Sequence, residues 1–198
     1  MAEDADVSAM AIDLTRLHRR TLTSFYSNLV TRPTGRAVRM GLESQLADLD
    51  PTAKACLSVL DFSQVHVLDY SCADEIVAKL LLRFAGNDRP ADAFFLARGL
   101  QEHHLEAVEA VLERHNLLLV MEAERGPTRL LGPSNAFERS CWAAVALRGQ
   151  CTIAEVVEQT QLPERTVRPT IARLLSQRVL VDLGEEVVCD ICALARER

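Results

Sequence analysis

The sequence predicts an α/β domain, a mostly parallel sheet covered by helices, followed by a small and mainly helical domain. In residues 1–131, apolar runs of strand length alternate with segments whose apolar residues recur at helical spacing. Such alternation favours parallel strands, because each helix carries the chain back to the edge where the next strand starts. From residue 136 onward helical spacing dominates, and glycine and proline cluster between the two parts.

The expected elements of the first part follow one another in order. A strand is expected at residues 11–14, and residues 21–30 suit either a helix or a strand. A helix starts at Thr34 and ends at Asp50-Pro51, because the residue before a proline avoids helical geometry. Strands and helices alternate along the rest of this part: strand 56–62, helix 72–84, strand 91–97, a helix from Leu105 to Leu112, strand 117–121 and a closing strand near Arg129–Leu131.

Two clusters of helix- and strand-breaking residues mark the boundary between the parts. Gly126-Pro127 predicts a turn between the last two strands, and Gly132-Pro133-Ser134-Asn135 predicts a short connection. We therefore expect a first domain over residues 1–131, a linker over 132–135 and a second domain over 136–198, each with its own core. A connection this short implies domains that touch each other.

The composition is that of a folded protein with a mild acidic charge. Hydrophobic residues make up 48% of the chain, and no apolar run approaches the roughly 20 residues of a membrane span. The first residues, Met-Ala-Glu-Asp-Ala-Asp, are acidic, unlike an export or mitochondrial leader, so a cytoplasmic protein is expected. The net charge is −6, and residues 136–198 hold eight basic and nine acidic residues, so neither part is a strongly basic nucleic-acid platform.

Neither a metal site nor an active site is expected. Cys189 and Cys192 have the C-x-x-C spacing of half a zinc site, but no second pair exists, and the adjacent His103 and His104 diverge on a helix. No nucleophile–base–acid arrangement, glycine-rich phosphate loop or paired carboxylate motif is found. We therefore predict no cofactor, no bound metal and no enzymatic activity.

The most informative segment of the first part joins a buried strand to a helix. The strand carries Asp61-Phe62-Ser63-Gln64-Val65, and the helix begins around Ala73-Asp74-Glu75. This pattern resembles the STAS domain of anti-sigma-factor antagonists and sulfate transporters, and more closely the STAS-like families of uncharacterised function. The resemblance covers about residues 10–131. It implies a protein switch or docking module, with a serine kinase or an anti-sigma-like protein as the class of partner.

Ser71 is the sharpest candidate site in this part. Ser71 and Asp74 have the spacing of a helix cap followed by an acidic first-turn residue. In anti-sigma-factor antagonists, a serine at the end of an Asp-Ser-Ser-Gly motif is phosphorylated, and the matching residues here are Asp69-Tyr70-Ser71-Cys72, without the glycine. A phosphate would be favoured by helix N–H groups and opposed by the nearby carboxylates. Ser71 is thus a phosphoacceptor or a helix cap, and the spacing alone explains the cap.

Three arginines surround the start of the helix at Thr34-Gly35. Arg32, Arg36 and Arg39 could hold an anion at the helix N-terminus, where N–H groups are free. The alternative is a solvated basic face.

The second part predicts three helices and a hairpin. Asn135 and Glu138 can cap a first helix that buries Phe137, and Thr152 and Glu155 form a capping box for the second. A third helix opens at residues 164–168, and strands 179–183 and 186–189 flank Gly184. This order resembles the winged helix-turn-helix of bacterial and archaeal regulators, over residues 136–189.

The resemblance makes the third helix a candidate DNA-reading helix. It offers a mixture of residues suited to bases and phosphates: Arg165, Thr166, Arg168, Thr170 and Arg173. Two features oppose DNA binding. The hairpin carries Asp182, Glu185 and Glu186, whose charge has the wrong sign for phosphates, and Pro169 is costly well inside a helix. If Thr166 were the helix cap, Pro169 would fall in the first turn, and the helix would be shorter than the family pattern.

These patterns lead to two functional hypotheses. The first is a non-enzymatic transcriptional regulator, in which a STAS-like domain senses a protein partner and the winged helix binds double-stranded DNA. The second is a protein-interaction adaptor, in which the winged helix mediates assembly instead. A homodimer is compatible with both hypotheses.

Overall fold

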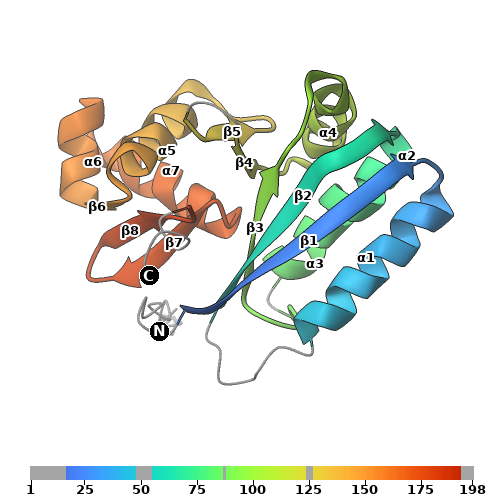
Figure 1. Ribbon diagram of the computed structural model, residues 1–198. Coiled ribbons are helices and arrows are strands. Elements are labelled where there is room, and N and C mark those ends of the chain that lie inside the picture. Colours follow the sequence, from blue (N-terminus) through green and yellow to red (C-terminus); the bar gives the residue numbers. More distant parts are fainter. Residues whose placement is uncertain (1–16, 48–54, 87, 124–126, 193–198) are drawn as a thin grey trace, which may run out of the picture.

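The computed structural model describes residues 17–47, 55–86, 88–123 and 127–192. Its centre is a five-stranded sheet in the order β1-β2-β3-β4-β5 (Figure 1). The strands β1 (Leu17–Leu29), β2 (Ala55–Leu68), β3 (Ala93–Arg98) and β4 (Leu119–Glu122) are parallel, and β5 (Arg129–Leu131) runs antiparallel to β4. This arrangement confirms the predicted α/β class with a mostly parallel sheet.

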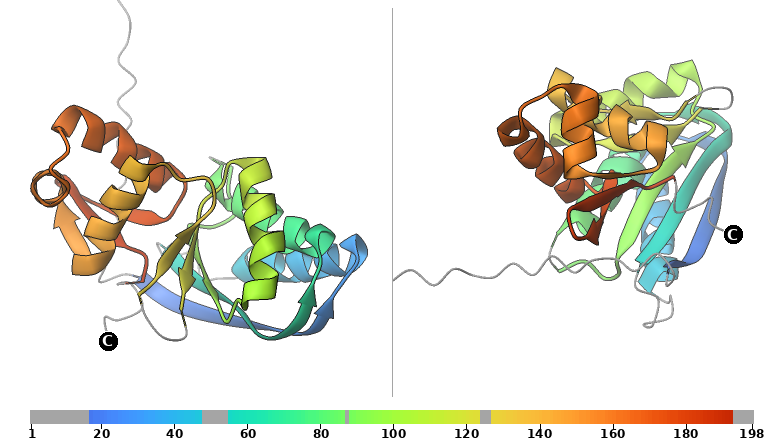
Figure 2. Two further views of the ribbon diagram at one scale, coloured as in Figure 1. Left: turned by 90° about the horizontal axis from the view of Figure 1, so that it is seen from above. Right: turned by 90° about the vertical axis from the view of Figure 1, so that its left-hand side faces the viewer.

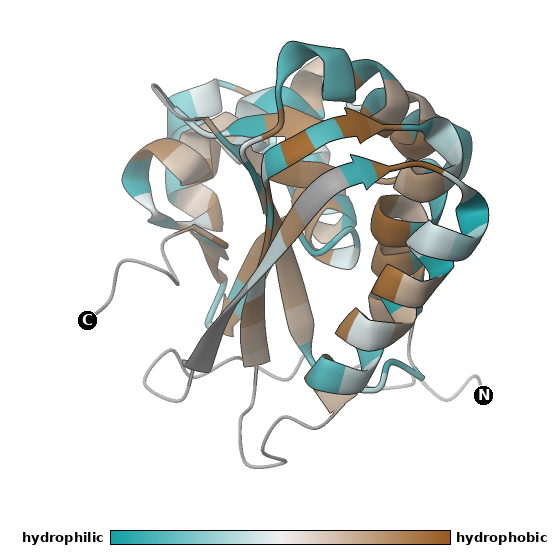
Figure 3. Ribbon diagram, turned by 45° about the vertical axis from the view of Figure 1, so that its right-hand side comes forward, coloured by the Kyte–Doolittle hydropathy of each residue, from teal (hydrophilic) through white to brown (hydrophobic). Residues whose placement is uncertain are grey.

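Helices cover one face of this sheet because the parallel strands are adjacent in chain order and every crossover is made on the same side. They are α1 (Arg32–Ala47), α2 (Tyr70–Ala73), the π-helix η2 (Asp74–Lys79), α3 (Leu80–Ala85) and α4 (Glu102–His115). Their apolar residues form one core with Leu60 and Phe62 of β2 and Phe95 of β3. In Figure 3 the hydrophobic colour lies both on the central strands and on the helix behind α1, whereas α1 alternates hydrophobic and hydrophilic residues.

The C-terminal part of the chain forms a compact unit beside the sheet. Its elements are α5 (Ala136–Arg148), β6 (Gln150–Thr152), α6 (Ile153–Thr160), α7 (Glu164–Ser176), β7 (Leu180–Gly184) and β8 (Val187–Asp190). The three strands form a small antiparallel sheet in the order β6-β8-β7. The β7–β8 hairpin is called the wing below.

This unit packs on the sheet face opposite the helices, and the expectation of two separate cores is wrong. Along β2 the side chains alternate, so Leu57 and Val59 point away from the first core and join Trp142, Ile171 and other residues of the C-terminal unit in one cluster. Figure 2 shows the unit and the helices α1, α3 and α4 on opposite sides of the sheet. The boundary at residues 132–135 stays a prediction, but the two parts share a core.

The end of α7 is bonded to the large sheet. Gln177 accepts a hydrogen bond from Leu118 N at 3.0 Å. Arg178 donates from Nε to Ala93 O at 2.8 Å, forms an ion pair with Asp92, and lies over the ring of Phe94 at 4.0 Å from its centroid. These polar contacts fix the C-terminal unit to the amino-terminal ends of β3 and β4.

Several predicted element boundaries change. The strand predicted at residues 11–14 lies outside the described residues. Of the two alternatives for residues 21–30 the strand is confirmed, since all but the last of these residues belong to β1. The polar residues Ser63 and Gln64 do not interrupt the strand but lie at a bulge, where Ser24 pairs with Asp61 and Tyr26 with Gln64. The short strand β6 had no clear sequence signal, and Phe137 is 50% exposed rather than buried.

The third helix of the C-terminal unit begins earlier than Pro169 suggested. Its N-cap is Pro163, so Thr166 is not the cap and Pro169 lies in the second turn. Pro169 cannot donate the usual bond to Arg165 O, and both residues lie on the exposed side of α7.

Candidate functional site

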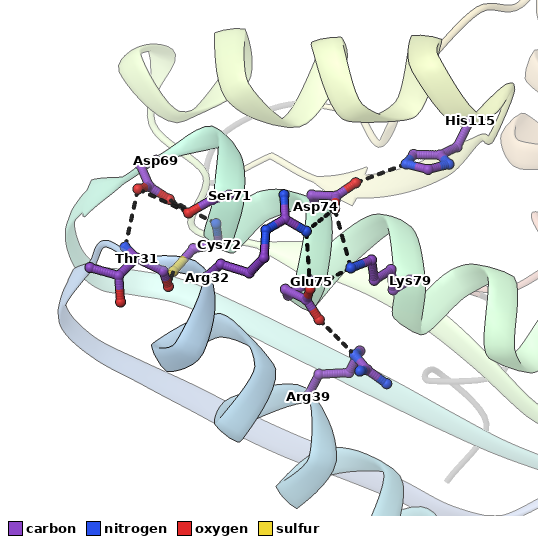
Figure 4. A network of polar contacts seen from close by, with 10 residues as sticks. All are labelled: Thr31, Arg32, Arg39, Asp69, Ser71, Cys72, Asp74, Glu75, Lys79 and His115. Atoms are coloured by element: carbon purple, nitrogen blue, oxygen red, sulfur yellow. Dashed lines mark hydrogen bonds and ion pairs between the residues drawn. The ribbon is translucent and has the colours of Figure 1, made fainter.

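A network of polar side chains lies where α1 meets α2 and η2, next to the ends of β1 and β2 (Figure 4). We call it the polar network. It consists of Thr31, Arg32, Arg39, Asp69, Ser71, Cys72, Asp74, Glu75, Lys79 and His115.

Asp69, rather than Ser71, caps the helix that follows β2. The Asp69 carboxylate accepts hydrogen bonds from Cys72 N at 2.7 Å and from Thr31 N at 3.1 Å, so it also ties the start of α1 to α2. Ser71 lies inside the helix, and its hydroxyl donates to Asp69 Oδ1 at 2.9 Å. The prediction of a Ser71 cap is therefore wrong by two residues, while its role as a phosphoacceptor stays a prediction.

The surroundings of Asp69 and Cys72 set their protonation in opposite directions. Burial alone would raise the pKa of Asp69, but hydrogen bonds from Cys72 and Thr31 outweigh it and lower the pKa. Burial and the charge of Asp69 raise the pKa of Cys72 to about 11, and its thiol donates to Thr31 O at 3.0 Å. Cys72 is thus a protonated, structural thiol at neutral pH.

Two adjacent carboxylates, Asp74 and Glu75, form the buried half of the network. They open the π-helix η2 and are only 5% and 2% exposed. Asp74 contacts Arg32 at 2.9 Å and His115 Nε2 at 2.8 Å. Glu75 contacts Arg32 and Arg39, each at 3.2 Å, and forms an ion pair with Lys79 one turn away. Buried carboxylates are tolerated only with such partners.

The partners also keep both carboxylates ionised. Burial would raise the pKa of Asp74, yet hydrogen bonds from His115 and Arg32 lower it. For Glu75 the same opposition holds, with hydrogen bonds from Lys79 and Arg39 outweighing burial. An acid–base catalyst needs a pKa near the working pH, so this pair is better suited to structure than to proton transfer.

Two of the three arginines predicted as an anion site, Arg32 and Arg39, bind carboxylates of the protein itself. Arg32 and Arg39 are bonded to Asp74, Glu75 and Glu43. Arg36 is exposed and has no recorded side-chain partner among the described residues. Gly35, in the first turn of α1, lets α1 and α2 approach closely. A Cβ at this position would come within 2.9 Å of Cys72 Cα.

The candidate DNA-reading side chains are spread over α7 and mostly engaged. Arg165 is exposed. Arg168 is bonded to Glu164 and to Glu186 of the wing, each at 2.7 Å. Thr170 donates its hydroxyl to Thr166 O at 2.7 Å, as a helical threonine commonly does.

Arg173 is bonded to two other segments of the protein. Its Nε lies 3.0 Å from Glu138 Oε1, a carboxylate on α5 with a side chain 4% exposed. It also donates to Asn116 Oδ1 at 3.1 Å, just after α4. Arg173 therefore helps to join the C-terminal unit to the rest of the chain.

A groove lies between α7 and the wing, and we call it the α7–wing groove. Its volume is about 380 Å³. Arg168, Ile171, Ala172 and Leu175 line it from one stripe of α7, and Ile153 comes from the start of α6. The wing contributes Val188 and the carboxylates of Asp182, Glu185 and Glu186.

Other sequence candidates are not brought together. Among the described residues, no group of three or more His, Cys, Asp or Glu side chains could hold a metal ion, and no helix has the length and apolarity to cross a membrane. The Nε2 atom of His103 lies 3.1 Å from His66 O and so links the start of α4 to β2. His104 Nδ1 accepts a hydrogen bond from Gln101 N at 3.2 Å and so helps to cap α4.

The chain matches no protein-family model and none of the curated proteins compared with it.

Sequence reasoning missed both Asp69 and the carboxylate pair as structural centres. The cap had a signal, since an aspartate three residues before Cys72 suits an N-cap as well as Ser71 does. For the ion pairs, the only local sequence signal was the four-residue spacing of Glu75 and Lys79, because Arg32 and Arg39 are far from Glu75 in the chain.

Replacing Asp69 and Ser71 separately by alanine tests which of the two residues caps α2. We expect Asp69→Ala to lower the free energy of unfolding by about 1–2 kcal/mol, because it leaves two N–H groups without their acceptor. Ser71→Ala removes a donor from an already bonded carboxylate and should cost less than about 0.5 kcal/mol. Urea denaturation followed by circular dichroism measures both; equal losses would return the capping role to Ser71.

Proposed function

We propose that this chain is a non-enzymatic cytoplasmic adaptor, in which a STAS-like part binds a protein partner and a winged-helix-like unit mediates assembly with another protein. The observation that carries the proposal is the engagement of the α7 arginines. Arg168 is bonded to two glutamates, and Arg173 is bonded to Glu138 and Asn116. A DNA-reading helix instead presents its arginines to phosphates and base edges.

The charge around α7 supports the same proposal. Glu164 precedes the exposed Arg165, and the wing adds Asp182, Glu185 and Glu186. These carboxylates repel the phosphates of a duplex. Non-specific DNA binding instead depends on lysines and arginines that neutralise phosphates and so release the counterions of the DNA. A protein partner with basic residues would meet complementary charge instead.

The STAS-like part carries the proposed signal at Ser71. The Ser71 hydroxyl is half-buried and bonded to the carboxylate that caps α2. A phosphate on Ser71 would place about −1.5 to −2 charges beside Asp69 and compete with that cap. Phosphorylation by a partner kinase would therefore loosen the contact between α1 and α2 rather than add to it.

A second candidate function is DNA-binding regulation of transcription, and one observation favours it. The C-terminal unit has the order helix, strand, helix, helix and two-stranded wing, with β6 paired to β8. That order is typical of winged helix-turn-helix domains, and Arg165 in the first turn of α7 is exposed.

An electrophoretic mobility assay with random-sequence duplex at low salt decides between these functions. We expect no shift for the wild type and a shift for the variant Glu185→Lys/Glu186→Lys, because that variant replaces repulsion by two phosphate contacts. A wild-type shift that Arg165→Ala/Arg168→Ala removes, with a salt slope reduced by about one unit per lost contact, would establish DNA binding instead.

A further inference from the structure

The α7–wing groove combines an apolar floor with an acidic rim. Ile153, Ile171 and Val188 are buried and form its floor, with half-buried Leu175 beside them. Asp182, Glu185 and Glu186 stand on the wing side. Its volume of about 380 Å³ lies within the range of ligand-binding pockets.

The rim glutamates occupy backbone positions that do not favour glutamate. The wing turn has two residues, Glu185 and Glu186, between the paired residues Gly184 and Val187, and their φ angles are 51° and 63°. Hairpin turns of this kind strongly prefer asparagine and glycine, because a side chain is strained at positive φ. The geometry of the turn therefore does not account for two carboxylates at this place.

The charge of the groove is only partly balanced from within. Arg168 pairs with Glu186 and Glu164, and Asp182 accepts a hydrogen bond from Gly184 N at 2.9 Å. Glu185 is exposed and has no recorded side-chain partner among the described residues. The lining thus holds three carboxylates against one guanidinium, over a floor of aliphatic side chains.

We infer that the α7–wing groove binds a basic amphipathic helix of a protein partner, an inference that rests on the proposed adaptor function. The apolar side of such a helix would pack on the exposed Ala172 and the half-buried Leu175, above the buried Ile171 and Val188. Its lysines or arginines would lie against Asp182, Glu185 and Glu186. Helices bound in grooves make contacts of this kind, with apolar anchors at helical spacing and charged residues at the rim.

A defined probe tests the inference on the whole chain. The probe is a short fluorescent peptide of leucine and lysine, with the leucines on one helical face. Fluorescence polarisation at about 0.15 M salt should show saturable binding with one peptide per chain. We expect Glu185→Lys/Glu186→Lys to weaken binding about tenfold, because attraction becomes repulsion at two positions. Ala172→Gln, a polar side chain over the floor, should weaken it about threefold or more.

Two matched variants control for charge and for helix composition. Glu113→Lys/Glu158→Lys changes the net charge by the same amount as the rim variant, at exposed positions outside the groove. Ala154→Gln makes the same replacement as Ala172→Gln, at an exposed helix position outside the groove. Both controls should bind the peptide like the wild type. Binding that the charge control weakens as much as the rim variant would mean unspecific attraction and would overturn the inference.

Two further measurements separate the remaining outcomes. Self-association in sedimentation velocity that Glu185→Lys/Glu186→Lys abolishes, without peptide competition, would make a second copy the occupant and overturn the inference. If neither peptide nor duplex binds, the groove inference fails and the adaptor function stands. Duplex binding by the wild type would overturn the adaptor function and, with it, the inference.

Discussion

Replacing Arg178 by alanine is expected to lower the free energy of unfolding by about 3 kcal/mol, the largest loss for any single arginine of the C-terminal unit. Arg178 follows α7 and reaches the large sheet, where it is bonded to Ala93 O and to the Asp92 carboxylate. Its guanidinium also covers the ring of Phe94, 4.0 Å from the centroid. The Arg178 side chain is 14% exposed, and this burial lowers its pKa against the opposing effect of Asp92.

Alanine at this position leaves the Ala93 carbonyl without the Arg178 donor and leaves the Asp92 carboxylate with Arg89 as its remaining cation, at 3.1 Å. Such half-broken pairs cost more than the pair itself contributes. Lysine should recover less than half of the loss, because a single ammonium cannot donate to both acceptors and also cover a ring as a planar guanidinium does. The position itself has φ of 58°, which every variant shares, so backbone strain does not separate them.

Urea denaturation of the whole chain measures this loss, with Arg165→Ala as the control. Arg165 is exposed on α7, and its removal should change the free energy of unfolding by less than about 0.5 kcal/mol. Tryptophan fluorescence reports on the same event, since Trp142 lies in the core shared by the two parts. Equal effects of the two replacements would mean that the contact between the C-terminal unit and the sheet does not depend on Arg178.

The elements that sequence reasoning predicted well are those with local signals. The capping boxes at Asn135–Glu138 and Thr152–Glu155 both form, because they depend only on residues three positions apart. The parallel strands follow from apolar runs that lie between helical segments. Residues 21–30 were ambiguous because they mix polar and apolar residues without a clear period.

The shared core had a signal in β2 that periodicity alone did not reveal. Every residue from Ala55 to Phe62 is buried, so both faces of this strand are covered. A strand buried on both sides needs a layer on each side, and helices fill only one of them. The C-terminal unit supplies the second layer, through long-range contacts that no local pattern encodes, such as that of Arg178 with Ala93, 85 positions away.

The candidate site was the least predictable part, for a similar reason. Ser71 and Asp69 are both good capping residues, and the choice between them depends on where the chain leaves β2. Asp69 N donates to Leu29 O at 3.1 Å, so the neighbouring strand β1 sets that point. Likewise, the sequence does not show that Arg32 and Arg39 pair with Glu75, because these residues come together only through the packing of α1 on η2.

Replacing Glu75 by glutamine is expected to lower the free energy of unfolding by about 3 kcal/mol at neutral pH. The Glu75 side chain is 3% exposed and is shared by Arg32, Arg39 and Lys79, which would keep their charges after the replacement. Glutamine can still accept one hydrogen bond, but its NH₂ group would face these cations. Glu43→Gln is the matched control: its side chain is 24% exposed and, among the described residues, is paired with Arg39 alone, so its loss should stay below about 1 kcal/mol.

The same replacement should flatten the acid side of the stability curve. Because the folded pKa values of Asp74 and Glu75 are lowered, their contribution is complete above the unfolded values near 4 and is lost as the pH falls through the folded values. The wild type should therefore lose stability steeply below about pH 5, and Glu75→Gln should lose less over the same interval. Urea midpoints measured from pH 7 down to about pH 3 test this difference. Parallel curves for the two proteins would mean that Glu75 is not held ionised by its partners, and that its buried pairs do not stabilise the contact between α1 and η2.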